Sequence, residues 1–441
     1  MHGRRAYYNI NRHINYTNYC VLRCKFCSFY RPFPKRHDGA QTAGHEASPV
    51  ASDLRVRRQD RPETGPPPPV GAACDRDPNR AREPAAGADG GYEYSLDEIV
   101  DLAAEAAQRG ATEVHIVGGL HPKLPFAFYT DMCRAIKQRC PDLHIKAFTA
   151  IEIVHFARIS RPRLSIEEVL IALREAGLGS LPGGGAEIFD DRVHDEAFTA
   201  KVGEKHWFDV HRAAHDLGIP SNATMLYGHV ETIEERVTHL VKLREHQDES
   251  LMRMQKAKCG IQNAKTRAES AGRRPEHAAD DRLALSAPGS ETAALASADA
   301  ATTFGHLPAA FQCCIPLSFI PEGSEFAHLP GPTGLDDLKT LAIARLMLDN
   351  FPHIKAFWPM QSSKLSQVAL NWGVDDFDGT VVWYDITKRE GRGTNRQELT
   401  IEQIQWLIRE AGCQPVERDT LYRPVIRDAA GRVIARGDTA A

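Results

Sequence analysis

Four segments of the chain carry the sequence signature of a helix start, followed by apolar residues at helical spacing. In each one, a Ser or Thr precedes a Glu or Gln by three residues, so the hydroxyl and the longer side chain can satisfy main-chain N–H groups at the helix start. Apolar residues then recur every three or four positions, which predicts amphipathic helices. These helices begin after Ser95, Ser165, Thr232 and Thr400, and Gly110, Gly177 and Gly412 mark ends of three of them.

Short apolar or β-branched runs lie between the predicted helices and predict strands. They are found around Ile14 and at residues 115–119, 144–150, 180–185, 219–226, 313–320, 353–360 and 379–383. Strands that alternate with helices form parallel βαβ units. The pattern therefore predicts an α/β fold, and a closed or nearly closed (βα) barrel is favoured over a doubly wound open sheet. In a barrel, the chemistry lies where strands end and loops begin.

Two stretches break this alternation. Residues 35–90 contain the run Pro66 to Pro69 and no aromatic residue, and residues 251–308 are dominated by Ala, Ser and Arg, with Phe304 the sole aromatic. Such segments bury too little apolar surface to offset the entropy of ordering them. We expect both to be disordered insertions.

The remaining segments add up to the size of one barrel. Residues 1–34, 91–250 and 309–441 are expected to form this single domain.

Composition excludes several classes of protein. The chain has 441 residues, 42% hydrophobic and 25% charged, with a formal net charge of −4. This balance gives no general attraction for nucleic acid or an anionic membrane. The N-terminus lacks the apolar core of a secretory signal, and no run is long enough to span a bilayer. We expect a cytoplasmic enzyme with a small-molecule substrate, with neither a nucleic acid nor a membrane as partner.

The candidate chemistry starts from three cysteines on one loop. Cys20, Cys24 and Cys27 have the spacing C-x3-C-x2-C. Three thiolates can hold three irons of a [4Fe–4S] cube and leave the fourth iron open to an outside ligand. Structural zinc is the competing interpretation, but it requires four closed ligands, for which His13 would have to complete the set.

Together with Phe26 just before the last cysteine, this motif resembles the radical S-adenosylmethionine (SAM) superfamily. The wider sequence is similar to the aminofutalosine synthase family of the futalosine route to menaquinone. The segments that carry the similarity are YYNINRHINYTNYC, GGLHP, KAFTAIEIVHFARIS, SLPGGGAEIF, NATMLYGHVET, HLPGPTGLDDLKTLAIARLMLDN and HIKAFWPM. They cover most of the predicted barrel domain and neither insertion.

The resemblance implies a [4Fe–4S] cluster and SAM as cofactors, and an electron donor such as flavodoxin or ferredoxin. Gly118 and Gly119 would meet the amino group of SAM through the main chain. Phe26 would pack against the adenine.

Residues after later strands are further candidates. Gly183 and Gly184 permit close main-chain approach to a ligand, and Glu187 could accept hydrogen bonds from the ribose. Glu152 is a candidate polar anchor or acid/base group, and His229 a candidate for contact with substrate or SAM.

The family's reaction joins the 5′-deoxyadenosyl group of SAM to 3-[(1-carboxyvinyl)oxy]benzoate. Carbon dioxide is lost, and 6-amino-6-deoxyfutalosine and methionine are formed. A substrate with two carboxylates calls for cationic or N–H donors. Lys146 and Lys355 are cationic but lie at the starts of predicted strands, which is the wrong end of a barrel for catalysis.

Two alternatives remain open at this point. The first is a sister radical SAM enzyme, such as a cyclic dehypoxanthinyl futalosine synthase or a deazaflavin-forming synthase. The second is a non-catalytic metal-binding protein that uses the cysteine loop for structure.

Overall fold

A computed structural model describes residues 3–34, 90–198, 200–272, 307–381 and 398–437 of the chain. The strands are β1 (Arg5–Asn9), β2 (Asn11–Ile14), β3 (Glu113–Ile116), β4 (His144–Ala147), β5 (Leu178–Ser180), β6 (Ser221–Tyr227), β7 (Phe311–Ser318), β8 (His353–Ile354), β9 (Asp376–Gly379), β10 (Gln414–Glu417), β11 (Val425–Arg427) and β12 (Val433–Arg436). The helices are α1 (Leu96–Gln108), α2 (Phe126–Arg139), α3 (Ala150–Ile159), α4 (Ile166–Glu175), α5 (Asp191–Ala197), α6 (Glu204–Asp216), α7 (Ile233–Gly272), α8 (Gly334–Met347), α9 (Trp358–Gln361), α10 (Ser363–Ala369) and α11 (Ile401–Glu410).

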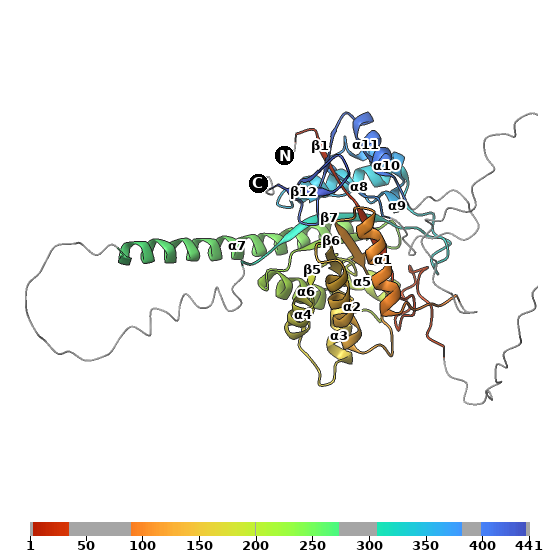
Figure 1. Ribbon diagram of the computed structural model, residues 1–441. Coiled ribbons are helices and arrows are strands. Elements are labelled where there is room, and N and C mark those ends of the chain that lie inside the picture. Colours follow the sequence, from red (N-terminus) through yellow and green to blue (C-terminus); the bar gives the residue numbers. More distant parts are fainter. Residues whose placement is uncertain (1–2, 35–89, 199, 273–306, 382–397, 438–441) are drawn as a thin grey trace, which may run out of the picture.

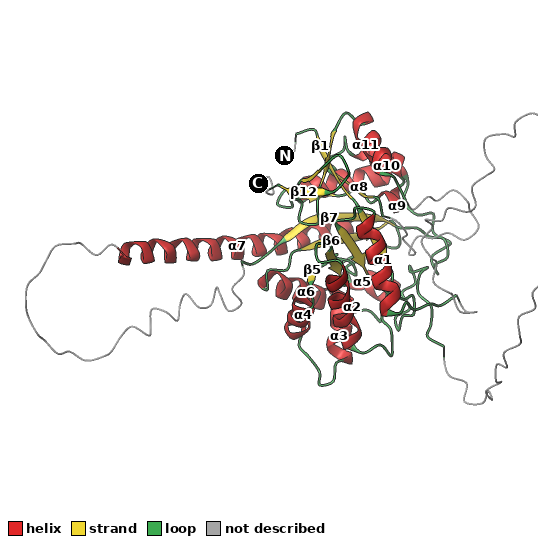
Figure 2. Cartoon of the chain, viewed as in Figure 1, coloured by secondary structure: helices red, strands yellow, loops and turns green. Residues whose placement is uncertain are grey.

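Parallel strand pairing runs around a closed barrel. Strands β2, β3, β4 and β5 pair in that order, as do β6, β7 and β8. Single bridges connect β5 to β6 at Leu181 and Ser221, and β8 to β9 at Lys355 and Asp376. Strand β9 pairs with β1, which continues into β2 after Ile10, so the pairing returns to its start. The α/β barrel favoured by the sequence is therefore present, with its helices outside the strands (Figures 1 and 2).

The predicted helix starts are confirmed. Both halves of the capping pattern are hydrogen-bonded at the starts of α1, α4, α7 and α11. A strand is present at each predicted run, but the bounds differ. The runs 180–185 and 379–383 share only Ser180 with β5 and Gly379 with β9, and residues 382–383 lie outside the described residues. The run at 353–360 contributes only His353 and Ile354 to β8, because helix α9 begins at Trp358.

The C-terminal segment after β10 packs across the end of the barrel where the strands begin. Arg418 is fully buried and binds Asp376 of β9, with 2.7 Å between its Nη2 and the carboxylate Oδ2. The hydroxyl of Thr420 donates to Glu113 at 2.7 Å, and Tyr422 stacks on His353 with 3.6 Å between ring centroids.

One expectation about the insertions is wrong in part. Helix α7 continues through residues 251–272, which we expected to be disordered, and it extends away from the barrel (Figure 1). The sequence of this stretch is rich in Ala, Lys, Arg, Gln and Met, which favour a helix even where no core is available. The rest of this insertion up to residue 306, and residues 35–89 of the other, lie outside the described residues. Among the residues that are described, no helix is long and apolar enough to cross a membrane.

Candidate functional site

The three cysteines lie on the loop that follows β2, at the end of the barrel where the strands finish. The loop is held by main-chain hydrogen bonds, from Cys20 N to the carbonyl of Arg31 (3.0 Å) and from Lys25 N to the carbonyl of Ala197 (2.9 Å). A tight turn brings Cys27 N within 3.0 Å of the Cys24 carbonyl. Cys24 is buried, and the other two cysteines are half-buried.

Burial raises the pKa of all three thiols, that of Cys24 to about 12. An iron–sulfur cluster is bound by thiolates, so its positive irons would have to offset this cost. The sulfur of Cys20 already accepts hydrogen bonds from the main-chain nitrogens of Leu22 (3.4 Å) and Leu120 (3.3 Å). Such donors stabilise a thiolate.

Within the described part of the chain, no three His, Cys, Asp or Glu side chains are arranged around a single metal ion. In a [4Fe–4S] cube each thiolate binds a different iron, so the three sulfurs need not converge on one point. The donor set, with three soft thiols on one loop, suits a cluster.

Gly118 and Gly119 follow β3 and pack directly against the cysteine loop. A Cβ at Gly118 would lie 2.6 Å from the ring of Tyr16, and one at Gly119 would overlap the carbonyl of Tyr19. Close packing alone therefore requires both glycines. It also brings the main chain of residues 118–120 against the loop.

Glu152, the candidate acid/base group, is fully buried and accepts four hydrogen bonds. Its Oε2 receives the main-chain nitrogen and the hydroxyl of Thr149, both at 2.7 Å. Its Oε1 receives the hydroxyl of Tyr16 at 2.8 Å and the nitrogen of Gly118 at 3.2 Å. Burial raises the pKa of Glu152 to about 7 although these bonds favour the carboxylate. Each of its two oxygens accepts two hydrogen bonds, so the Glu152 carboxylate connects Tyr16, Gly118 and Thr149.

The glycines after β5 pack against the neighbouring strand and helix. A Cβ at Gly183 would overlap the main chain of Asn222 in β6. The carbonyl of Gly183 accepts a hydrogen bond from the hydroxyl of Thr224 at 3.0 Å. The carbonyl of Gly184 accepts the indole N–H of Trp207 at 3.3 Å. The chain then reaches Glu187, a buried residue with a positive φ of 47°, an uncommon backbone conformation outside glycine.

Glu187 forms an ion pair with Lys201 beside the cysteine loop. The ammonium group of Lys201 lies 5.3 Å from the ring centroids of both Phe26 and Phe198. Although burial disfavours its charge, the neighbouring Glu187 carboxylate and the Cys24 thiol raise the pKa of Lys201. Its positive charge in turn acts to lower the pKa of all three cysteine thiols.

His229 packs against the rings of Phe26 and Phe319. Its ring lies nearly parallel to that of Phe26, with 6.5 Å between centroids, and edge-on to Phe319. Its Nε2 lies 3.0 Å from the carbonyl of Leu226, and its Nδ1 lies 3.4 Å from Glu231. Burial lowers the pKa of His229. Its side chain is completely enclosed and packs against Phe26 and Phe319.

Lys146 and Lys355 are buried inside the barrel as partners of carboxylates. The ammonium of Lys146 lies 2.9 Å from Glu113, and that of Lys355 lies 2.7 Å from Asp378. They are thus neither solvated surface charges nor free cations for the substrate.

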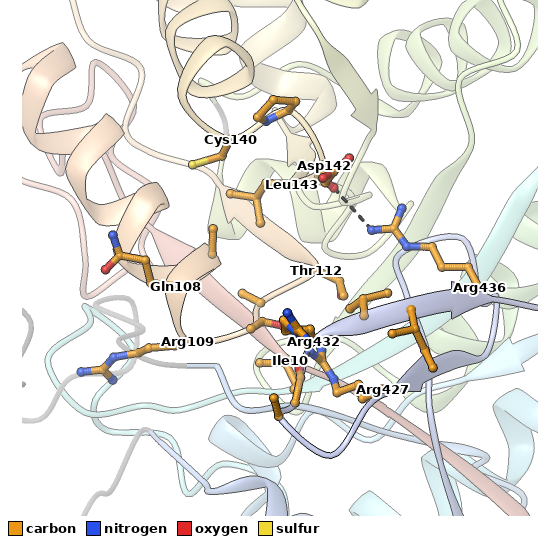
Figure 3. Close-up of a pocket in the computed structure, with 18 of the residues that line it drawn as sticks. Ile10, Gln108, Arg109, Thr112, Cys140, Asp142, Leu143, Arg427, Arg432 and Arg436 are labelled. Carbon is orange, nitrogen blue, oxygen red and sulfur yellow. Dashed lines mark hydrogen bonds between the residues drawn. The ribbon is translucent and has the colours of Figure 1, made fainter.

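A cavity of about 930 Å³ lies beside the end of the barrel where the strands begin, and no predicted site residue lines it (Figure 3). Arginines of the β11–β12 hairpin face the C-terminal ends of α1 and α2 across it. Arg427 binds Glu417 and the carbonyl of Gly110, and Arg436 approaches the carbonyl of Asp142 at 3.5 Å. These cations are paired with helix-end carbonyls and carboxylates. The cavity is lined by residues that precede the strands, such as Ile10, Thr112 and Leu143, whereas the cysteine loop follows β2, so the two lie at opposite ends of the barrel.

Sequence comparison defines the class of protein. Residues 14–243 match the radical SAM superfamily, and residues 309–430 match the CofH/MqnC C-terminal region. The chain belongs to the radical SAM superfamily, and this membership implies a [4Fe–4S] cluster and SAM.

The curated relatives are enzymes of two kinds. An aminodeoxyfutalosine synthase from Thermus thermophilus is 36% identical over 96% of this chain and 84% of its own length. Another from Streptomyces coelicolor is 31% identical over 99% and 86%. A 5-amino-6-(D-ribitylamino)uracil–L-tyrosine 4-hydroxyphenyl transferase from Methanopyrus kandleri is 30% identical over 96% and 85%.

Solved structures agree with the barrel. Methylornithine synthase matches with a TM-score of 0.53 at 13% identity, over 94% of this chain and 84% of that one. The hydrogenase maturase HydG from Carboxydothermus hydrogenoformans matches with a TM-score of 0.52 at 13% identity, over 96% and 70%. At these identities the likeness concerns the fold alone.

Three residues of the site were not predicted from sequence. Lys201 is a single lysine in a loop, and nothing in its surroundings in the sequence points to the cysteines. Tyr16 lies four residues before the first cysteine without a motif of its own. Thr149 could have been found, because Thr149 and Glu152 have the same spacing as the four predicted helix starts.

Proposed function

We propose that this protein joins the 5′-deoxyadenosyl group of SAM to 3-[(1-carboxyvinyl)oxy]benzoate, with loss of carbon dioxide, to give 6-amino-6-deoxyfutalosine and methionine. The observation that carries the proposal is the similarity to the Thermus aminodeoxyfutalosine synthase, at 36% identity across 96% of the chain. The product would be used in menaquinone biosynthesis.

Cys20, Cys24 and Cys27 would each bind one iron of the cluster. When bound, the cluster supplies the electron that cleaves SAM at its sulfonium. The main-chain donors of Leu22 and Leu120 would stabilise the Cys20 thiolate. The charge of Lys201 favours the anionic form of all three sulfurs.

The same surroundings suit the polar groups of SAM. Glu187 binds Lys201 through Oε1, and its other carboxylate oxygen has no hydrogen-bond partner among the described residues, so it would accept the ribose hydroxyls. Lys201 would pair with the carboxylate of SAM, and main-chain atoms of Gly118 and Gly119 would meet its amino group. The ring of Phe26 would cover the adenine.

Aromatic rings would keep water and other hydrogen-atom donors away from the 5′ carbon of the deoxyadenosyl group. Phe26 contacts Phe198 edge-on at 5.9 Å, and His229 connects Phe26 to Phe319. A rigid apolar wall of this kind aligns reactants and excludes side reactions.

The experiment is an anaerobic reaction of cluster-loaded protein with SAM, dithionite and the enolpyruvyl benzoate, followed by mass spectrometry. The proposal predicts a product that contains the adenosyl group and lacks one carbon dioxide. The product should be lost in Cys24→Ala and retained in Cys259→Ala, a matched change at an exposed cysteine far from the loop in sequence.

The second candidate is the hydroxyphenyl transferase reaction, which the Methanopyrus relative favours at 30% identity. A parallel reaction with tyrosine and 5-amino-6-(D-ribitylamino)uracil separates the two. Free 5′-deoxyadenosine with a joined tyrosine product would transfer the assignment to that reaction. Intact SAM in both reactions, with the cluster present, would instead leave a structural metal-binding role.

A further inference from the structure

The carboxylate of Glu152 connects three separate segments of the chain. Its Oε2 caps helix α3 through Thr149, and its Oε1 accepts hydrogen bonds from Tyr16 before the cysteine loop and from Gly118 after β3. The residue is 1% exposed. Burying a carboxylate is costly unless its oxygens are hydrogen-bonded, and here each oxygen accepts two donors.

The other capping pairs show that a cap alone does not require this arrangement. At α1 and α4 the carboxylate binds only its own cap residue, and both pairs are exposed to solvent. Glu152 differs because its second oxygen lies buried against two segments outside the helix. That oxygen needs an explanation beyond helix capping.

The segment held by Oε1 leads directly to a cysteine. Gly118 N donates to Glu152, and Gly119 N donates to the carbonyl of Thr17 at 2.8 Å. Leu120 N then donates to the sulfur of Cys20 at 3.3 Å, while Val21 N returns to the carbonyl of Leu120 at 3.0 Å. Glu152 is therefore connected to the Cys20 sulfur through three consecutive residues.

We propose that Glu152 is a positioning residue that holds the main chain of residues 118–120 in place, so that Leu120 donates its N–H to the sulfur of Cys20. The inference rests on the proposed function in one respect, namely that Cys20 is a cluster ligand. The number of N–H donors to a ligand sulfur helps to set the reduction potential of a cluster. Glu152 thereby acts on the site without touching substrate or cofactor.

Hydrogen exchange of individual amides in the cluster-free chain tests the proposal. In Glu152→Ala, the amide of Gly118 should exchange about tenfold faster or more, because it loses its buried hydrogen bond. The amide of Leu120, which donates to the Cys20 sulfur, should also exchange faster, because the segment that holds it is loosened. Thr149→Ala removes the hydroxyl of the α3 cap and leaves Oε1 in place, so both amides should keep their protection. Glu168→Ala, at the matched cap of α4, should also leave them unchanged.

Two results would overturn the proposal. One is unchanged exchange of Gly118 and Leu120 in Glu152→Ala. The other is equal acceleration in Thr149→Ala, which would assign the effect to the helix cap. If the alanine variant does not fold, Glu152→Met, which keeps much of the side-chain volume and removes both acceptor oxygens, is compared with the same controls and judged by the same two results.

A second measurement separates this inference from the proposed function. In the loaded protein, Glu152→Ala should shift the cluster's reduction potential to a more negative value than Glu152→Gln, because both variants lose the charge near Cys20 and only alanine also loses the acceptor that holds Gly118 N. Glu168→Ala should not shift the potential. Equal potentials in the two Glu152 variants would contradict the inference. Failure of the wild-type protein to cleave SAM would contradict the proposed function, and it would leave the exchange result as it stands.

Discussion

The main-chain nitrogen of Leu120 lies 3.3 Å from the sulfur of Cys20, with the loop after β3 hydrogen-bonded to the cysteine loop after β2. These loops follow neighbouring parallel strands, whose carboxyl ends meet at one edge of the barrel. The contact is possible only because Gly118 and Gly119 have no side chains. The geometry of the cysteine loop therefore depends on the segment that packs against it.

Gly119→Ala tests this dependence. The added Cβ would overlap the carbonyl of Tyr19, so the cysteine loop or the end of β3 must move. We expect the variant to incorporate much less iron and sulfide on reconstitution than the wild-type protein. Iron and sulfide analysis per chain measures the loss.

Gly203→Ala is the matched control. Gly203 precedes helix α6 with a negative φ of −71°, and no atom lies within 4 Å of an added Cβ. Its iron and sulfide content should equal that of the wild type. Equal cluster content in Gly119→Ala would show that the loop does not depend on close packing at this position.

Asp376→Asn should destabilise the protein, because it breaks the buried ion pair with Arg418 at the end of the barrel where the strands begin. Although burial opposes it, the charge of Arg418 lowers the pKa of Asp376 to about 2. Removing the carboxylate leaves a fully buried arginine without its partner, which costs about 3–5 kcal/mol. Denaturant unfolding measures the loss. Arg432→Ala, which removes an exposed pair with Asp428, should cost less than about 1 kcal/mol. Similar losses would contradict the assigned role of the buried pair.

Acidification should destabilise the protein through buried histidines packed on Phe311. Burial lowers the pKa of His246 to about 3, and it holds the pKa values of His211 and His215 well below 6.5. In the unfolded chain these histidines take up protons near pH 6.5, whereas in the folded chain they stay neutral to a lower pH. Stability is therefore lost as the pH falls from about 6.5 toward 3. Denaturation midpoints across this range measure the effect.

His246→Phe should weaken this pH dependence. The ring lies between Phe208 and Phe311, at 5.1 and 5.4 Å between centroids, so a phenyl group suits the site. Loss of one titrating group should lower the slope by up to about 1.4 kcal/mol per pH unit. An unchanged slope would mean that His246 does not contribute.

The outer part of α7 should be dispensable for stability. Beyond Ala257 the described side chains, up to Asn263, are exposed or half-exposed, and the helix leaves the barrel (Figure 1). Replacing residues 261–306 with a short Gly/Ser linker should leave the unfolding midpoint unchanged. A large decrease would show that this segment contributes to the core.

The inner part of α7 provides the contrast. Gln247 exchanges two hydrogen bonds with the main chain of Phe311, at 2.9 and 3.0 Å. Gln247→Ala should cost about 1–3 kcal/mol, because it leaves buried main-chain groups unpaired.

Local patterns in the sequence predicted the alternation of strands and helices, with four helix starts and the approximate places of eight strands, but not strands β1 and β10–β12 or the remaining helices. The four capping pairs depend on residues three positions apart, and the strands are apolar runs between them, so both can be recognised without tertiary information. The fifth pair, Thr149 and Glu152, is harder to recognise, because the apolar run at 144–150 predicts a strand that continues past Thr149. The helical extension of α7 was missed because low apolar content argues against burial and not against a helix.

Contacts between distant segments could not be predicted in this way. Lys201 reaches Glu187 and the cysteine loop only once the barrel has formed. Arg418 and Asp376 lie 42 residues apart, and neither has a motif. The cysteines were recognisable because three ligands of one cluster lie on one loop, whereas the residues around them come from several strands.

The most direct test of the account is electron paramagnetic resonance of the reduced, cluster-loaded protein before and after addition of SAM. If Cys20, Cys24 and Cys27 hold three irons and leave the fourth open, the spectrum should change when SAM binds that iron, and Cys24→Ala should lack the signal. A spectrum that SAM does not alter, from an intact cluster, would contradict the account.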